Sequence, residues 1–152
     1  MVHPAASPTL ALSVRRVLRA APERVFRAWT QAEELKRWFA PGPDFSIPIS
    51  EVDLRVGGRY RLGMQGPAPA PLSVATGVYE EITPPSRLVF TWRWENAAPE
   101  ALTTRVTVEF RPHADGTQLI ITHEGFTEPS DRDQHAAGWE GCLAVLEHSL
   151  VC

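Results

Sequence analysis

Residues 139–150, WEGCLAVLEHSL, place apolar side chains at successive spacings of four, three and four, at Trp139, Leu143, Leu146 and Leu150. This spacing puts the four side chains on one face of a helix. Burying each of them is worth roughly 1.5–3 kcal/mol, so the helix needs an apolar surface to pack against. Most of the sequence before it has strand character, and we therefore expect the helix to lie on one face of an antiparallel sheet.

The start of this helix is predicted at Ser130. A serine hydroxyl can accept a hydrogen bond from the free N–H groups of a first helical turn. Asp131 and Asp133 add negative charge in the same turn, where the helix dipole favours it.

The predicted sheet begins with a strand over 10–18, and two short helices follow it. Pro22 suits the first position of the first helix, because its missing N–H has no partner to lose there. Thr30 and Glu33 fit a capping box that starts the second helix, and Pro-Gly-Pro at 41–43 ends it. We expect this helical pair to close one end of the space that the sheet encloses.

Six further strands are predicted downstream, because the hydrophobic period changes to two. Gly57-Gly58 and Asp115-Gly116 supply turn signals between some of them. The fold class is therefore α+β. The expected strand ranges are 47–54, 59–64, 72–82, 88–94, 103–111 and 119–123.

Composition predicts a single domain over 9–152, with a loose lead over 1–8. The chain has 152 residues, of which 43% are hydrophobic. It carries 15 basic and 18 acidic side chains, a formal net charge of −3, without a basic run. Nucleic acid is therefore not an expected partner, since phosphate binding needs clustered positive charge.

The sequence predicts a cytoplasmic protein without a membrane span, cofactor or metal. No apolar run approaches the roughly 18 residues that a span requires, and the N-terminus lacks the order of a signal peptide. Cys142 and Cys152 would lie about 15 Å apart along one helix, so both are predicted to be free thiols. His135 and Cys142 share a helical face, but two ligands fall short of a zinc site.

Five ordered blocks of sequence resemble a known family. They are 19–30 (RAAPERVFRAWT) with 35–41 (LKRWFAP), 53–60 (DLRVGGRY), 84–92 (PPSRLVFTW), 122–126 (THEGF) and 138–139 (GW). In these blocks the chain is similar to bacterial AHSA1-like proteins, which are grouped with the C-terminal domain of the activator of Hsp90 ATPase. The resemblance implies the helix-grip fold of the START and Bet v 1-like (SRPBCC) superfamily. There, a curved antiparallel sheet of about six to seven strands wraps a long C-terminal helix and leaves a cavity.

From the residues themselves, the apolar strand faces that point at the helix would form one concave surface. Such a surface either packs solid or encloses a pocket, and its many aromatic side chains favour a pocket for a small apolar or amphipathic molecule. The residues expected to bind that molecule are Trp38, Tyr60, Leu62, Met64, Phe90, Trp92, Trp94, Val106, Val108, Ile121, His123, Trp139 and Leu143.

His123 is the polar candidate of that set, since alternation places it on the same face as Leu119 and Ile121. A histidine there could donate a hydrogen bond to a ligand or act as a general base. No carboxylate is placed to orient its ring, because Glu124 follows directly and points the other way. We therefore prefer a structural role, in which His123 bonds to a backbone carbonyl.

Three functions remain open, in the following order. The first is a binding module for a small apolar or amphipathic molecule. The second is an enzyme of the cyclase or hydrolase kind, in which His123, with Tyr60, moves a proton. The third, implied by the resemblance, is an Hsp90-type co-chaperone. The eukaryotic activator has an additional N-terminal domain that this sequence lacks, which argues against the third function. A homodimer through a sheet edge or the 66–71 loop is also compatible with the sequence.

Overall fold

A computed structural model of the chain describes residues 9–98, 101 and 103–151. It confirms the predicted succession of one strand, two helices, six strands and one long helix. The predicted lead over 1–8 and Cys152 lie outside the described residues. The elements are β1 (Leu10–Leu18), α1 (Pro22–Thr30), α2 (Ala32–Trp38), β2 (Ser46–Val52), β3 (Arg59–Gln65), β4 (Leu72–Thr83), β5 (Arg87–Trp94), β6 (Thr104–His113), β7 (Gly116–Phe126) and α3 (Pro129–Val151).

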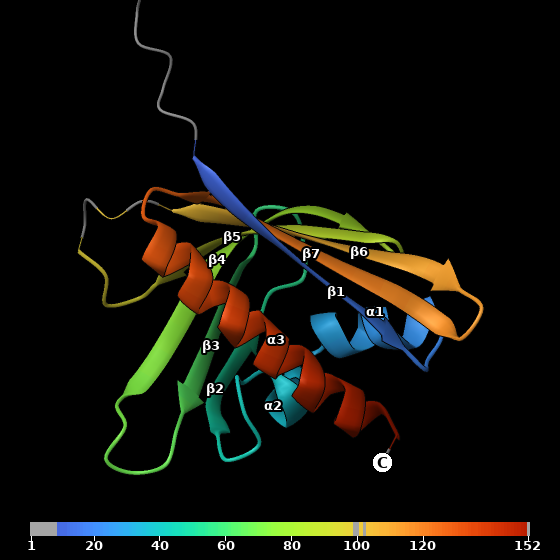
Figure 1. Ribbon diagram of the computed structural model, residues 1–152, viewed down its shortest axis with the longest axis horizontal. Helices are drawn as coiled ribbons and strands as arrows, with labels where there is room; N and C mark the ends of the chain where they lie inside the picture. Colours follow the sequence, from blue (N-terminus) through green and yellow to red (C-terminus); the bar gives the residue numbers. More distant parts are fainter. Residues whose placement is uncertain (1–8, 99–100, 102, 152) are drawn as a thin grey trace, which may run out of the picture.

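The seven strands form one antiparallel sheet in the order β1-β7-β6-β5-β4-β3-β2. β1 and β2 are consecutive strands in the chain, yet they lie at opposite edges of the sheet. α3 lies across the strongly curved sheet and contacts β1, whereas α2 contacts β2 and α3 (Figure 1). The two short helices therefore connect the two edges of the sheet. The described helices include none with the length and apolar character needed to cross a membrane.

The apolar stripe of α3 is confirmed. Trp139, Leu143 and Leu146 are buried, and Leu150 is half-buried against the same core. The inward faces of the strands show the predicted two-residue alternation, and they meet α1, α2 and α3 in one hydrophobic core. Its buried strand residues include Leu12, Val14, Tyr60, Leu62, Met64, Leu88, Phe90, Trp92, Val106, Val108, Leu119 and Ile121.

The prediction that Ser130 caps α3 is wrong, because the helix begins one residue earlier at Pro129. Proline takes a first helical position readily, since its fixed φ suits the helix and no N–H is lost there. The carbonyl of Glu128 accepts the N–H of Arg132 at 3.1 Å, which closes the first turn ahead of Ser130.

The predicted capping box between the short helices is also wrong. Thr30 is the last residue of α1, and its hydroxyl donates to the Phe26 carbonyl at 2.9 Å. Gln31, with an extended backbone, separates α1 from α2, and its side chain makes no capping bond. The two helices are instead joined through the core, where the indole N–H of Trp38 donates to the Ala28 carbonyl at 2.9 Å.

α3 approaches the segment between α2 and β2 most closely at Gly141. A β-carbon at this position would overlap the backbone carbonyl of Pro41. At Gly138, one turn earlier, a β-carbon would meet no atom within 4 Å. Packing therefore requires glycine at 141 but not at 138.

We expect Gly141→Ala and Gly138→Ala to change stability in opposite directions. Alanine favours a helix, so Gly138→Ala should raise the free energy of unfolding by about 0.5–1 kcal/mol. Gly141→Ala should lower it by about 1–3 kcal/mol, because the helix must move away from Pro41. Urea denaturation of both variants and the parent measures the difference, and a Gly141→Ala variant as stable as the parent would contradict the packing constraint.

Candidate functional site

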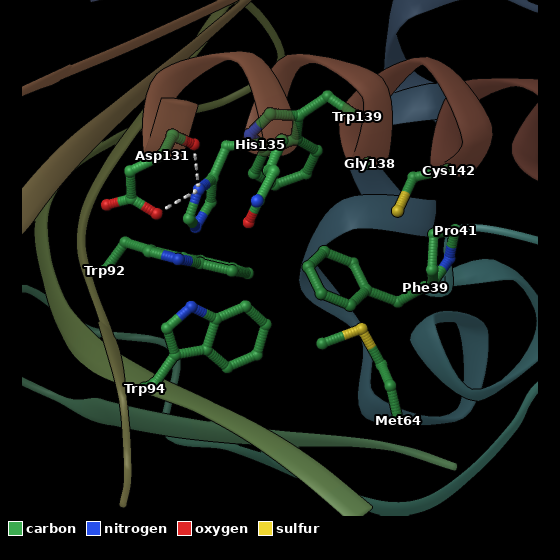
Figure 2. Close-up of a pocket in the computed structure, with 11 residues that line it drawn as sticks. Phe39, Pro41, Met64, Trp92, Trp94, Asp131, His135, Gly138, Trp139 and Cys142 are labelled. Atoms are coloured by element: carbon green, nitrogen blue, oxygen red, sulfur yellow. Dashed lines mark hydrogen bonds and ion pairs between the residues drawn. The ribbon is translucent and has the colours of Figure 1, made fainter. Parts of the chain in front are cut away.

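A pocket of about 340 Å³ lies between the first half of α3, the end of α2 and strands β3 and β5 (Figure 2). Its volume falls within the roughly 300–1,000 Å³ that is usual for small-molecule sites. Aromatic and apolar side chains form most of the wall, and the charged and amide groups come from the first turns of α3. The lining residues are Phe39, Pro41, Met64, Trp92, Trp94, Asp131, Gln134, His135, Gly138, Trp139 and Cys142.

The aromatic wall is built from three parts of the chain. Trp92 and Trp94 are two residues apart on β5, so both point to the same side of the sheet, with ring centres 5.4 Å apart. Trp139 of α3 lies 5.4 Å from Trp92, and Phe39 lies 5.8 Å from Trp139. The buried rings of Phe39, Trp92 and Trp139 hold one another in place, and together with Trp94 they form a wall suited to flat apolar groups.

The polar end of the pocket contains Asp131 and His135, which are one turn apart on α3 (Figure 2). Nδ1 of His135 lies 2.8 Å from the backbone carbonyl oxygen of Asp131 and 3.4 Å from the carboxylate Oδ1 of Asp131. A carbonyl oxygen only accepts, so Nδ1 carries the proton. Nε2 of His135 is buried and has no hydrogen-bond partner among the described residues.

His123 is fully buried behind this wall and is bonded through both ring nitrogens. The indole N–H of Trp139 donates to its Nδ1 at 3.0 Å, so Nε2 carries the proton and donates to the Thr104 hydroxyl at 2.7 Å. That hydroxyl donates in turn to the Trp92 carbonyl at 3.1 Å. The predicted direct bond from His123 to a backbone carbonyl is therefore wrong, since the Thr104 hydroxyl stands between them.

Burial, and to a smaller extent the neighbouring His135, lowers the pKa of His123 to about 3. The ring is therefore neutral at pH 7. A neutral imidazole is the form that this network requires, because its Nδ1 must accept from Trp139 while its Nε2 donates.

The structure divides the residues that we expected to bind ligand into three groups. Met64, Trp92, Trp94 and Trp139 line the pocket of about 340 Å³. Tyr60, Leu62 and Phe90 surround a separate space of only about 10 Å³, too small for an organic ligand. The others are buried in the core around these spaces, at Trp38, Val106, Val108, Ile121, His123 and Leu143. The part of each residue in ligand binding stays a prediction.

Sequence reasoning left most of the helical side of the pocket out of the ligand set. The available signal was a second helical face with spacings of four, three and four, which consists of Asp131, His135, Gly138 and Cys142. Burial raises the pKa of the Cys142 thiol to about 12, so it is neutral at pH 7. Within the described parts of the chain, no three His, Cys, Asp or Glu side chains gather as a metal site would require.

The neutral, buried state of His123 predicts a pH-dependent stability. The unfolded chain protonates this histidine near pH 6.5, whereas the folded protein resists protonation down to about pH 3. Below pH 6.5 the unfolded state therefore binds more protons, and the free energy of unfolding falls as the pH falls. The contribution amounts to about 2 kcal/mol between pH 7 and pH 5.

His123→Gln should be less stable than the parent at pH 7, and this difference should narrow by about 2 kcal/mol at pH 5. Urea denaturation at both pH values measures it. His113→Gln, at an exposed position on β6, controls for the loss of a histidine. A difference in the free energy of unfolding that stays constant from pH 7 to pH 5 would contradict the assignment of a neutral His123.

Comparison with known proteins gives a family match. Residues 19–150 match the family described as "Activator of Hsp90 ATPase homolog 1-like protein". A comparison with curated proteins gave no match.

Several solved structures share the fold. A Chromobacterium violaceum protein is 30% identical with a TM-score of 0.81, covering 91% of this chain and 94% of that chain. A Nitrosomonas europaea protein is 30% identical with a TM-score of 0.75, covering 91% and 92%. The AHSA1 protein of Silicibacter pomeroyi, at 22% identity and a TM-score of 0.82, covers 93% and 98%.

The family match spans most of the chain and agrees with the five sequence blocks and with the sheet wrapped around α3. This chain therefore belongs to the activator of Hsp90 ATPase homolog 1-like family.

Proposed function

We propose that this protein binds a small apolar or amphipathic molecule in the pocket beneath the first turns of α3. The observation that carries the proposal is the wall of Phe39, Trp92, Trp94 and Trp139, with charged groups confined to one end. An apolar wall with a few polar groups is the usual form of a small-molecule site, since the wall supplies affinity and the polar groups supply orientation. Proteins of this fold commonly bind hydrophobic ligands.

Proton transfer by His123 and Tyr60 does not enter this proposal. Both ring nitrogens of His123 are engaged, by Trp139 and Thr104. The hydroxyl of Tyr60 donates to the Thr91 carbonyl at 2.6 Å, and burial raises the pKa of that hydroxyl well above its usual value. Either residue would have to break these bonds before it could exchange a proton with a ligand, which favours binding over catalysis. The homodimer and the chaperone contact stay predictions.

Native mass spectrometry of the protein purified from its own host, followed by organic extraction, tests this proposal. We expect a co-purifying molecule of defined mass that is lost from Trp92→Ala, while Trp29→Phe, which changes an indole outside the pocket and keeps a ring against Trp139, retains it. Equal retention by both variants would place the molecule elsewhere and contradict the proposed site.

A side chain added at Gly138 should block the pocket without disturbing the core. Gly138 lines the pocket, and a β-carbon there meets nothing within 4 Å, so Gly138→Leu extends into the open space. Ala137→Leu is the matched control, because Ala137 is exposed and lies outside the pocket lining. We expect the Kd of the fluorescent probe N-phenyl-1-naphthylamine to rise at least about tenfold for Gly138→Leu and to stay unchanged for Ala137→Leu. Equal affinity in both variants would place the probe outside this pocket.

A further inference from the structure

Two buried nitrogen atoms lie at the polar end of the pocket without a hydrogen-bond partner among the described residues. They are Nε1 of Trp92 and Nε2 of His135. The two rings are nearly perpendicular, at 83°, and their centres are 6.3 Å apart. A buried polar atom left unpaired destabilises the protein, so two such atoms beside a pocket mark the place where a ligand's polar group would gain the most binding free energy.

The two nitrogens have complementary roles. Nδ1 of His135 donates to the Asp131 carbonyl, so in the neutral form of the ring Nε2 is an acceptor. The indole N–H of Trp92 can only donate. The pocket therefore offers one unused donor and one unused acceptor on neighbouring rings.

We propose that the ligand is a neutral alcohol or phenol, whose hydroxyl accepts from Nε1 of Trp92 and donates to Nε2 of His135. This inference rests on the proposed binding function and names the class of ligand. A hydroxyl group both donates and accepts, so it satisfies both nitrogens. A carboxylate only accepts, and it would lie near the carboxylate of Asp131. An ammonium group only donates, and it would leave the Trp92 N–H unpaired.

Both nitrogens are buried, so a ligand hydroxyl reaches them only after a neighbouring side chain moves, and Trp94 is the candidate. Trp94 packs against both rings, 5.4 Å from Trp92 and 6.0 Å from His135 between ring centres. It is the last residue of β5 and is only half-buried, so it is the least constrained ring of the aromatic wall. A second hollow of about 280 Å³, which Trp94 also lines, gives the indole room to move.

Four naphthalene probes with different polar groups test this proposal. They are 2-naphthalenemethanol, 2-methylnaphthalene, 2-naphthoate and 2-naphthylmethylammonium, and competition with N-phenyl-1-naphthylamine at pH 7 gives each Kd. We expect the alcohol to bind at least about tenfold tighter than the hydrocarbon, and tighter than either ion. An alcohol that binds no tighter than the hydrocarbon, or more weakly than an ion, would overturn the inference.

Trp92→Phe removes the donor and keeps an aromatic ring in the wall. The readout is the ratio of the two Kd values within the variant: the alcohol should lose its advantage over 2-methylnaphthalene, and this ratio should fall to about one. The control is Trp29→Phe, because the Trp29 indole N–H is also buried and unpaired among the described residues but lies outside this pocket. An alcohol preference that survives in Trp92→Phe would also overturn the inference.

His135→Phe provides an independent variant if Trp92→Phe does not fold, since it removes the acceptor and retains a ring. It should likewise abolish the advantage of the alcohol. The binding site and the hydroxyl preference are tested separately by these probes. Hydrocarbon binding without an alcohol preference overturns the hydroxyl assignment alone, whereas failure of all four probes to bind overturns the proposed function and this inference together.

Discussion

The indole of Trp139 is the contact on which the arrangement of this protein depends. It stacks on Trp29 of α1 with ring centres 5.8 Å apart, and it meets Phe39, just after α2, at the same separation. It packs against Trp92 of β5 and donates its N–H to His123 of β7. A large, stiff ring tolerates little displacement in a packed core. The position of α3 is therefore fixed together with those of the two short helices and the middle of the sheet.

The same indole separates a packed region from an open one. Trp29, on one side of Trp139, borders a space of only about 10 Å³. On the other side, Trp139 lines the pocket of about 340 Å³. The close approach of Gly141 to Pro41 holds α3 down at the edge of this pocket, whereas the first turns of the helix carry Asp131 and His135 over it. The pocket thus combines an aromatic wall with a polar end, both supplied by elements that the core holds in place.

Most of the fold could be predicted because its signals are local and repeated. Alternation of apolar residues along β5 and β6 and the four-three-four spacing in α3 each identify an element without knowledge of its partners. The errors concern single residues at helix ends. Ser130 and Thr30 both have capping chemistry, but Pro129 takes the start of α3, and the Thr30 hydroxyl bonds back to its own helix. Several residues compete for such positions, and the sequence does not rank them.

The site was less accessible to sequence reasoning. Periodicity places Tyr60, Met64 and Trp92 on inward faces alike, yet the pocket of about 340 Å³ lies beside the last two and a space of only about 10 Å³ lies beside the first. The partners of His123, Trp139 and Thr104, come from two other elements, and the spacing of residues within one strand carries no information about such contacts. What decides whether an inward face becomes core or pocket is the distance between layers, which depends on contacts such as that of Gly141 with Pro41.

The pairing of β1 with β7 bears on how the chain is made. Leu10 faces Phe126 and Leu18 faces Thr117, so β1 finds its neighbour in the sheet only after the long segment between the two strands has been translated. Pairings between distant segments form slowly, because a long loop must close first. Until then, β1 exposes a row of free backbone groups and apolar side chains that can associate with other nascent chains. The hairpins from β3 to β7 can form earlier, so the growing sheet provides the template onto which β1 finally docks.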